Sequence, residues 1–267
     1  MVSTLAVYRR LVGAQARSQA SYRVSFTLDL LGNIVWLGAD LLGITVFFRI
    51  TPSLGGFGFA DVLVMLGLSA SAFALADLAV GNIEKLRVYV RTGLLDSVLI
   101  KPLGVLPQLL ALDFGLRRLG RAGYALVILV AALWYADIAW TPEKAALVVV
   151  TPLAGAAFFS AIFVAGATVA FWWIESGELA NALTYGGRDF TSYPITVYSG
   201  WFRRLFAYAL GFAFVAYYPA LAVLDEPDPL GLPAATAWAG PVVAALAAAV
   251  AAALWRFGVR RYRSTGS

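Results

Sequence analysis

The sequence contains no histidine and no cysteine among its 267 residues. Without cysteine the chain has no disulfides or thiolate ligands, and without histidine it has no Ser-His-Asp triad or histidine-based metal site. Lysine occurs only at Lys85, Lys101 and Lys144, and none of the three follows a glycine. The chain therefore lacks the glycine-lysine step of a phosphate-binding loop. We expect no enzyme activity, no cofactor and no metal bound by this chain.

Charge is scarce as well. Only 13% of the residues are charged, while 61% are hydrophobic and the mean hydropathy is +0.80. Soluble domains are about a quarter charged and close to half apolar. The composition therefore predicts an integral membrane protein. The sequence shows no soluble domain and no linker long enough to join one, so we expect a single all-α domain over residues 1–267.

Six apolar segments are long enough to cross a bilayer, which takes about 20 helical residues. We place these spans at residues 24–48, 59–80, 121–136, 145–174, 205–224 and 238–257. Pro219 is expected to end the fifth span early.

The positions of the basic residues set the orientation. With both termini in the cytoplasm, 18 of the 20 lysines and arginines fall on the inner side, and only Arg49 and Lys144 fall outside. Positive charge is enriched in cytoplasmic loops. The net charge of +5 is thus explained by an N-in, C-in topology, and we expect contact with membrane lipid and none with nucleic acid.

Three inner segments flank these spans. Residues 1–23 carry apolar side chains at helical spacing between arginines and are predicted to form an amphipathic helix on the membrane surface. Residues 82–104 form a charged loop between the second and third spans. Residues 175–204 are predicted to be a second cytoplasmic loop, with a short helix that Gly186 and Gly187 bring to an end.

Polar residues follow one face of the first span. Asn33, Trp36 and Asp40 recur at helical spacing, and Asp77 lies near the inner end of the second span. Carboxylates facing lipid cost roughly 2.5–3.5 kcal/mol at the bilayer centre. These four residues are candidates for a substrate path suited to cationic or amphiphilic compounds; hydrogen bonding between helices is the alternative, and for Asp77 the favoured one.

The loop after the second span combines a short amphipathic helix with basic residues. Leu86 and Tyr89 share one side of this helix, Glu84, Lys85, Arg87 and Arg91 surround them, and Gly93 interrupts it. From the residues alone, the loop suits either docking to a partner protein or attachment to anionic lipid.

The run Val90-Arg91-Thr92-Gly93-Leu94-Leu95-Asp96, followed by Leu99-Ile100-Lys101-Pro102, resembles a pattern found in bacterial type-2 ABC transporter permeases. The resemblance implies that the loop is a coupling helix that docks in a groove of a cytoplasmic ATPase. On this chain Leu86 and Tyr89 would be its apolar anchors; Gly93 would allow a turn, and Asp96 would cap the next segment or pair with Arg91. The polar contacts would come from Glu84, Lys85, Arg87 and Arg91.

The family resemblance also implies the assembly and its location. Two permeases, identical or homologous, would work with two copies of an ATP-binding subunit that holds ATP and magnesium, in the bacterial inner membrane. The chain would then export a hydrophobic or amphiphilic small molecule, cationic ones included, or a lipid-like compound. An ion-coupled transporter or a channel without an ATPase, with Asp40 and Asp77 as ion sites, is the alternative.

Overall fold

The computed structural model describes residues 23–112 and 117–262, and within these ranges it contains helices and no strands. The long helices are α2 (Arg23–Ile50), α3 (Phe59–Val80), α7 (Arg117–Tyr135), α8 (Pro142–Thr168), α9 (Gly177–Thr191) and α12 (Gly240–Arg261). The shorter α-helices are α4 (Leu86–Arg91), α5 (Leu94–Leu99), α6 (Val105–Ala111), α10 (Gly200–Arg203) and α11 (Tyr217–Leu224). Tighter or wider turns form η1 (Gly81–Lys85), η2 (Val169–Phe171), η3 (Ile195–Val197), η4 (Arg204–Ala209), η5 (Phe212–Phe214) and η6 (Ala234–Trp238).

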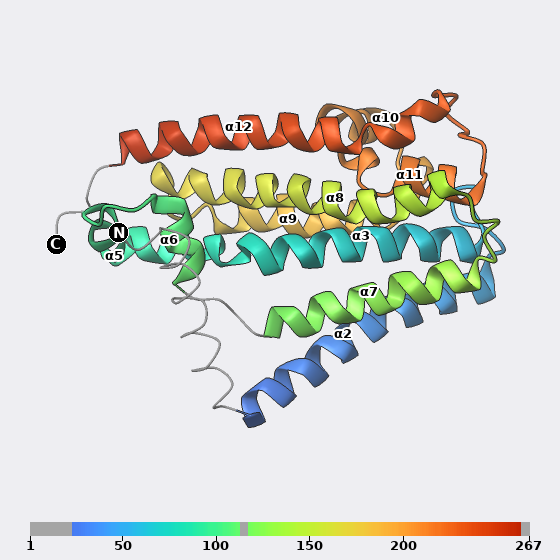
Figure 1. Cartoon of the computed structure of the whole chain (residues 1–267), viewed down its shortest axis with the longest axis horizontal. Helices are drawn as coiled ribbons and strands as arrows, with labels where there is room; N and C mark the ends of the chain where they lie inside the picture. Colours follow the sequence, from blue (N-terminus) through green and yellow to red (C-terminus); the bar gives the residue numbers. More distant parts are fainter. Residues whose placement is uncertain (1–22, 113–116, 263–267) are drawn as a thin grey trace.

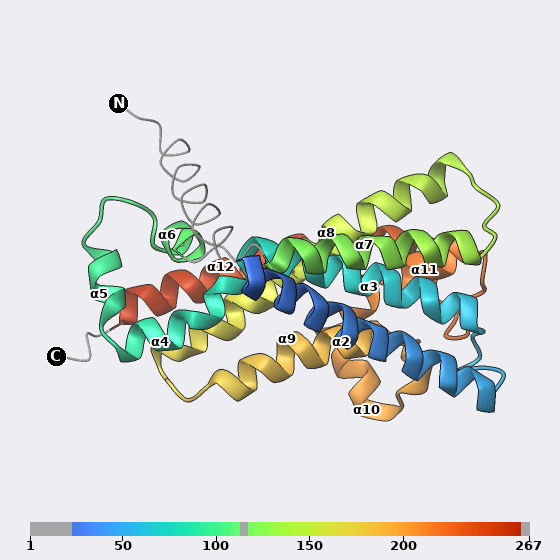
Figure 2. The same cartoon turned by 90° about the horizontal axis from the view of Figure 1, so that it is seen from below.

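The long helices lie roughly side by side along one axis (Figures 1 and 2). Helix α3 is central: most of it is buried, and it packs against α7 and α8, while α12 packs on α8. One end of the bundle carries α4, α5 and α6, and we call it the α5 end (Figure 1). The opposite end carries α11 and the turn at residues 51–58, and we call it the α11 end.

Length and apolarity identify four helical segments of the described chain that can cross a membrane: Phe59–Arg91, Arg118–Tyr135, Pro142–Phe171 and Gly240–Arg261. A bent pair, Gly200–Ala209 and Phe212–Leu224, makes a fifth if it is counted as one span. The multi-pass, all-helical architecture is therefore confirmed. The first predicted span is not among these segments, because its described apolar stretch, Leu41–Ile50, is shorter than a bilayer crossing requires. Six crossings therefore remain a prediction, and so does the N-in, C-in orientation.

Local sequence explains where the central helices begin. The Asp61 carboxylate accepts a 2.8 Å hydrogen bond from the backbone amide of Gly58, at the start of α3. The hydroxyl of Thr141 accepts a bond from the amide of Lys144, and Pro142 occupies the first turn of α8. Proline is well tolerated there because the first amides of a helix have no intrahelical acceptor.

Small residues allow the helices to approach closely. Ala244, Ala251 and Gly258 of α12 are buried, and a methyl group on Gly258 would collide with Phe171 and Thr168. A methyl group on Gly67 of α3 would lie 2.9 Å from the Cα atom of Leu129 in α7. These contacts stabilise the bundle by van der Waals packing, which is the main source of helix association in lipid.

The segment predicted to be a second cytoplasmic loop has a different structure. Helix α9 continues through Gly186 and Gly187 to Thr191 and runs back along α8 and α3 (Figures 1 and 2). Beyond it, the Thr196 hydroxyl donates a 2.7 Å hydrogen bond to the carbonyl of Gly55, in the turn at the α11 end. Residues 177–199 therefore lead from one end of the bundle toward the other instead of forming a loop at one end.

The fifth predicted span, residues 205–224, is likewise not one helix. Its two parts meet at 60°, and the break lies at Gly211, whose backbone has a φ of 87°. A side chain at Gly211 would collide with Val243, so both the turn and the close contact require glycine. Pro219 lies in the first turn of α11, where it fits, and does not end a helix.

Candidate functional site

The α5 end holds the segment that the sequence singled out. Helices η1 and α4 follow α3, and α5 folds away after a turn in which Gly93 has a φ of 71°. L-residues with side chains rarely adopt this conformation, so glycine is required at that point. Residues 81–104, which we call the coupling segment, are therefore two short helices joined by a glycine turn at the end of the central helix.

The apolar side chains of this segment are arranged differently from the prediction. Leu86, predicted as a docking anchor, is fully buried inside the chain's own core, as are Val90, Leu95 and Val98. Tyr89 is half-buried against the same core. The side chain of Leu86 is thus unavailable to a partner, because it holds the coupling segment to the bundle.

Four other apolar side chains of the segment are exposed. They are Val88, Leu94, Leu99 and Ile100, with exposed fractions of 47%, 52%, 37% and 84%. The exposed basic residues Arg87, Arg91 and Lys101 lie in the same segment. Exposed apolar groups surrounded by charge are typical of a protein contact.

Contacts to the other inner elements position the segment. The Arg91 guanidinium donates a 2.5 Å hydrogen bond to Glu175, in the turn before α9. Burial and the neighbouring Asp96 carboxylate raise the pKa of Tyr262, the residue that follows α12. Asn82 donates a 2.6 Å bond to the carbonyl of Leu109 in α6. The coupling segment thus contacts α6, α9 and the end of α12 together.

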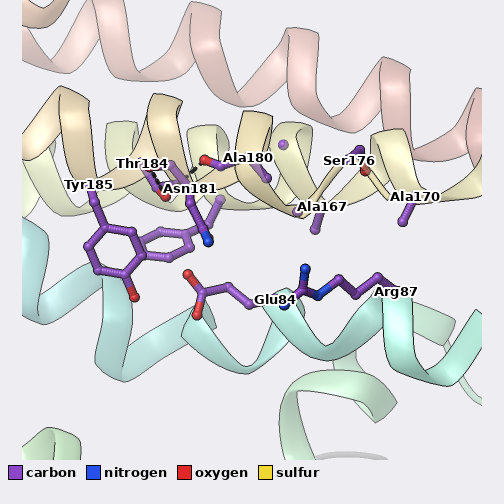
Figure 3. A pocket seen from close by; sticks show the side chains of 12 residues that line it. Glu84, Arg87, Ala167, Ala170, Ser176, Ala180, Asn181, Thr184 and Tyr185 are labelled. Atoms are coloured by element: carbon purple, nitrogen blue, oxygen red, sulfur yellow. Dashed lines mark hydrogen bonds between the residues drawn. The ribbon is translucent and has the colours of Figure 1, made fainter. Parts of the chain in front are cut away.

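A cavity of about 210 Å³ lies between the coupling segment and the start of α9 (Figure 3). Glu84 and Arg87 line one side, while Asn181, Thr184 and Tyr185 line the other. Tyr185 points toward Glu84 across the gap (Figure 3). Glu84 therefore lies between the coupling segment and α9 and faces α9, whereas it was predicted to contact an external partner.

The guanidinium of Arg87 closes one side of this cavity. A methyl group on Gly177, the first residue of α9, would overlap that guanidinium. Gly177 therefore permits α9 to begin directly against the coupling segment. The arrangement gives two points of contact between these elements, at Arg87 and at the Arg91–Glu175 pair.

Asp77, a candidate for the substrate path, lies in an ion-pair cluster near the end of α3. Its carboxylate is 3.1 Å from Arg118 Nε and 2.6 Å from Arg121 Nη1, and its side chain is only 3% exposed. A methyl group on Gly81 would collide with it. This geometry supports a structural role for Asp77, joining α3 to the start of α7.

The other substrate-path candidates are on α2. The backbone of α2 is helical through Asn33, Trp36 and Asp40, which confirms that the three lie on one helix. Their side chains, and the surface helix predicted for residues 1–23, lie outside the described residues.

Several residues of this site had no distinguishing signal in the sequence. In the sequence, Glu175 has the pattern of a charged residue in a solvated loop, and Arg118 and Arg121 only indicate which side of the membrane their segment lies on. Their partners lie 84, 41 and 44 positions away in the chain, beyond the reach of any local pattern. Spacing alone could have identified Val90 as buried, since it follows Leu86 by one helical turn.

The described residues contain no group of three acidic side chains able to hold a metal ion. A family model described as ABC-2 family transporter protein matches residues 34–266. Comparison with curated proteins and with solved structures gave no match.

Proposed function

The chain belongs to the ABC-2 family of transporter proteins, and from this membership we propose that its coupling segment docks onto a separate ATP-hydrolysing subunit. Family membership makes it the membrane subunit of an ABC transporter. The transported compound is proposed to be hydrophobic or amphiphilic and to be exported across a bacterial inner membrane. Two permeases and two ATPases would form the complex, with ATP and magnesium bound by the ATPases.

One observation carries the docking proposal: Leu94 and Ile100 are exposed at the α5 end, although Leu86, Val90, Leu95 and Val98 of the same segment are buried. A surface-lying loop would place its apolar residues toward the bilayer alongside the bundle, whereas α5 lies at the end of the long axis (Figure 1). Apolar residues there, with Arg87, Arg91 and Lys101 around them, suit a groove with acidic margins on a cytoplasmic protein.

The contacts with α9 supply a route for transmission. When a docked ATPase moves the coupling segment, Arg87 and Arg91 would displace the start of α9, and the cavity at Glu84 leaves room for that displacement. Movement of α9 against α3 and α8 would then change access to the transport route. Such coupling needs an element with two arrangements that both sites can bias.

Purification of the tagged chain from its native membrane in mild detergent tests the proposal. We expect an ATPase to co-purify, with ATP hydrolysis in the preparation, and to be lost from the double variant Leu94→Asp/Ile100→Asp. The matched control is Leu232→Asp, an exposed leucine in the loop at the α11 end, which should retain the ATPase.

Each part of the proposal has its own contradicting result. A folded wild-type preparation without any ATPase would favour an ion-coupled transporter. An ATPase that stays bound to the double variant would place docking elsewhere on the chain. Substitution of Leu86 is unsuitable as a test, because its side chain is buried and its loss would unfold the segment.

A further inference from the structure

Helix α12 ends at the α5 end of the bundle, where it packs closely on η2 (Figure 1). A methyl group on Gly258 would collide with Phe171, the last residue of η2. The ring centroid of Phe171 also lies 5.5 Å from that of Trp255 and 5.9 Å from that of Tyr262. These contacts hold the end of α12 in place, so the backbone that carries its outward side chains has a fixed position.

One outward side of α12 is apolar over most of its length. It carries exposed side chains at spacings of four, four and three residues, which are Leu246, Val250, Leu254 and Phe257. At these spacings the four residues form a stripe along the helix. Because α12 is apolar and long enough to cross a bilayer, the stripe suits contact with the acyl chains of lipids.

The stripe ends in positive charge. Arg260 and Arg261 follow Phe257 by three and four residues, Arg256 precedes it, and all three arginines are exposed. Helix α12 contains no acidic residue, and no carboxylate in the described part of the chain forms an ion pair with these three arginines. Contact with the carbonyl end of the helix uses only part of their capacity, since each guanidinium has five N–H donors.

Aromatic rings lie beside these arginines. The guanidinium of Arg261 is 4.5 Å from the ring centroid of Phe257, and the ring of Trp172 lies 5.6 Å from that of Phe257 on its neighbouring side chain. Trp172 and Phe257 are 49% and 47% exposed, and Trp173 is 54% exposed. Tryptophan is enriched at the level of the lipid headgroups. The arginines at this end of α12 therefore lie near the depth of lipid phosphates.

We propose that this surface, formed by Trp172, Arg256, Phe257, Arg260 and Arg261, binds an anionic phospholipid; we call it the α12 terminal surface. Guanidinium groups match phosphate oxygens in charge and in hydrogen-bonding geometry, and clusters of basic residues next to a membrane span attract anionic lipids. A soluble anion would use the arginines alone, whereas a phospholipid also covers the exposed rings and the apolar stripe. The combination therefore fits a lipid.

The α12 terminal surface adjoins the coupling segment. Turn η2 packs against α4, and Tyr262, which follows α12, lies beside Asp96 of α5. A phospholipid bound here would therefore contact the elements that hold the coupling segment to the bundle. The inference goes beyond the proposed docking and does not depend on it, because the lipid site belongs to this chain alone.

Native mass spectrometry of the purified chain in mild detergent measures lipid binding directly. The two probes are phosphatidylglycerol, which carries one negative charge, and phosphatidylcholine with the same acyl chains, which has no net charge. We expect phosphatidylglycerol to bind about tenfold more tightly, and Arg260→Gln/Arg261→Gln to abolish this preference. Arg260→Lys/Arg261→Lys retains both charges and should keep a preference of about threefold or more.

The matched control is Arg49→Gln/Arg204→Gln, which removes two exposed arginines toward the α11 end. It should change the ratio of the two affinities by less than about twofold, because these arginines lie far from the α12 terminal surface and are screened from it. Equal melting temperatures of the two glutamine double variants in lipid-free detergent would show that a lost preference does not come from misfolding.

Equal affinities for the two lipids in the wild-type chain would overturn the proposal, and so would an equal loss of preference in the control. Displacement of phosphatidylglycerol by its water-soluble headgroup, glycerophosphoglycerol, would identify a site for soluble anions instead. Loss of a co-purified ATPase from Arg260→Gln/Arg261→Gln, with an unchanged lipid preference, would assign the surface to the ATPase. A lipid preference in a chain that recovers no ATPase would support the lipid site and reject the docking alone.

Discussion

At the scale of single residues, Asp77 shows how a charge is stabilised in an apolar bundle. Its two carboxylate oxygens each face one arginine, Arg118 and Arg121. The side chain of Arg118 is only 12% exposed. Each of the two buried charges is therefore compensated by the other. Removing one member of a buried pair leaves the other charge without compensation, which costs more than the pair contributes.

We predict that Asp77→Asn destabilises the protein by about 3 kcal/mol. The second change in Asp77→Asn/Arg118→Met should restore part of this loss, because it removes the uncompensated cation. Denaturation in mixed micelles, followed by circular dichroism, measures both, and Glu226→Gln serves as a control on the surface. A loss no greater than that of the control would mean that the ion-pair cluster adds nothing to stability.

At the scale of elements, α9 shows that packing between distant residues can override a local sequence pattern. Two adjacent glycines predict a helix end, because glycine is costly inside a helix. Gly187 is nevertheless required within α9, since a side chain there would overlap the ring of Phe212. That contact lies 25 positions further along the chain, so no local pattern could have revealed it.

The two glycines therefore respond differently to the same substitution. Gly187→Ala is expected to cost about 1–3 kcal/mol through overpacking against Phe212. Gly186→Ala should be neutral or stabilise α9 by up to about 1 kcal/mol, because the site is open and alanine favours the helix. Thermal unfolding of the purified pair tests this; equal melting temperatures would contradict the packing of α9 on Phe212.

The coupling segment was more predictable than α9 for the same physical reason. Its glycine turn and its short helix depend on residues a few positions apart, and both are present at Gly93 and in α4. Which of its apolar residues are buried depends on packing against other elements, chiefly α8 and η2, which are distant in sequence, and the adjacent α6. The choice of Leu86 as an external anchor was wrong for that reason.

At the scale of the whole molecule, the course of α9 changes the distribution of basic residues. Arg203 and Arg204 follow Thr196, which is bonded to the turn at the α11 end, and α10 lies toward that end (Figure 1). Arg203 and Arg204 therefore lie toward the α11 end, as Arg49 and Lys144 do, whereas Arg188 lies within the bundle. The α5 end still holds the larger share of the described positive charge, which favours a cytoplasmic location for it.

Single cysteines can establish this orientation. In intact cells, an impermeant thiol reagent should label Ser53→Cys and Ser199→Cys, both exposed in segments at the α11 end. Ser97→Cys, exposed in α5, should be labelled only after permeabilisation. Labelling of Ser53→Cys and Ser199→Cys from opposite sides would contradict the course of α9, and labelling of Ser97→Cys in intact cells would reverse the orientation.

The shared core of the coupling segment has a consequence for its mechanics. Leu86, Val90, Leu95 and Val98 are buried together with residues of the bundle, so the segment cannot open by itself without exposing that core. Its amide protons should exchange with deuterium nearly as slowly as those of α3, although it lies at the end of the molecule. A force applied at Ile100 would therefore not be dissipated by local melting, and the coupling segment would act as a stiff lever.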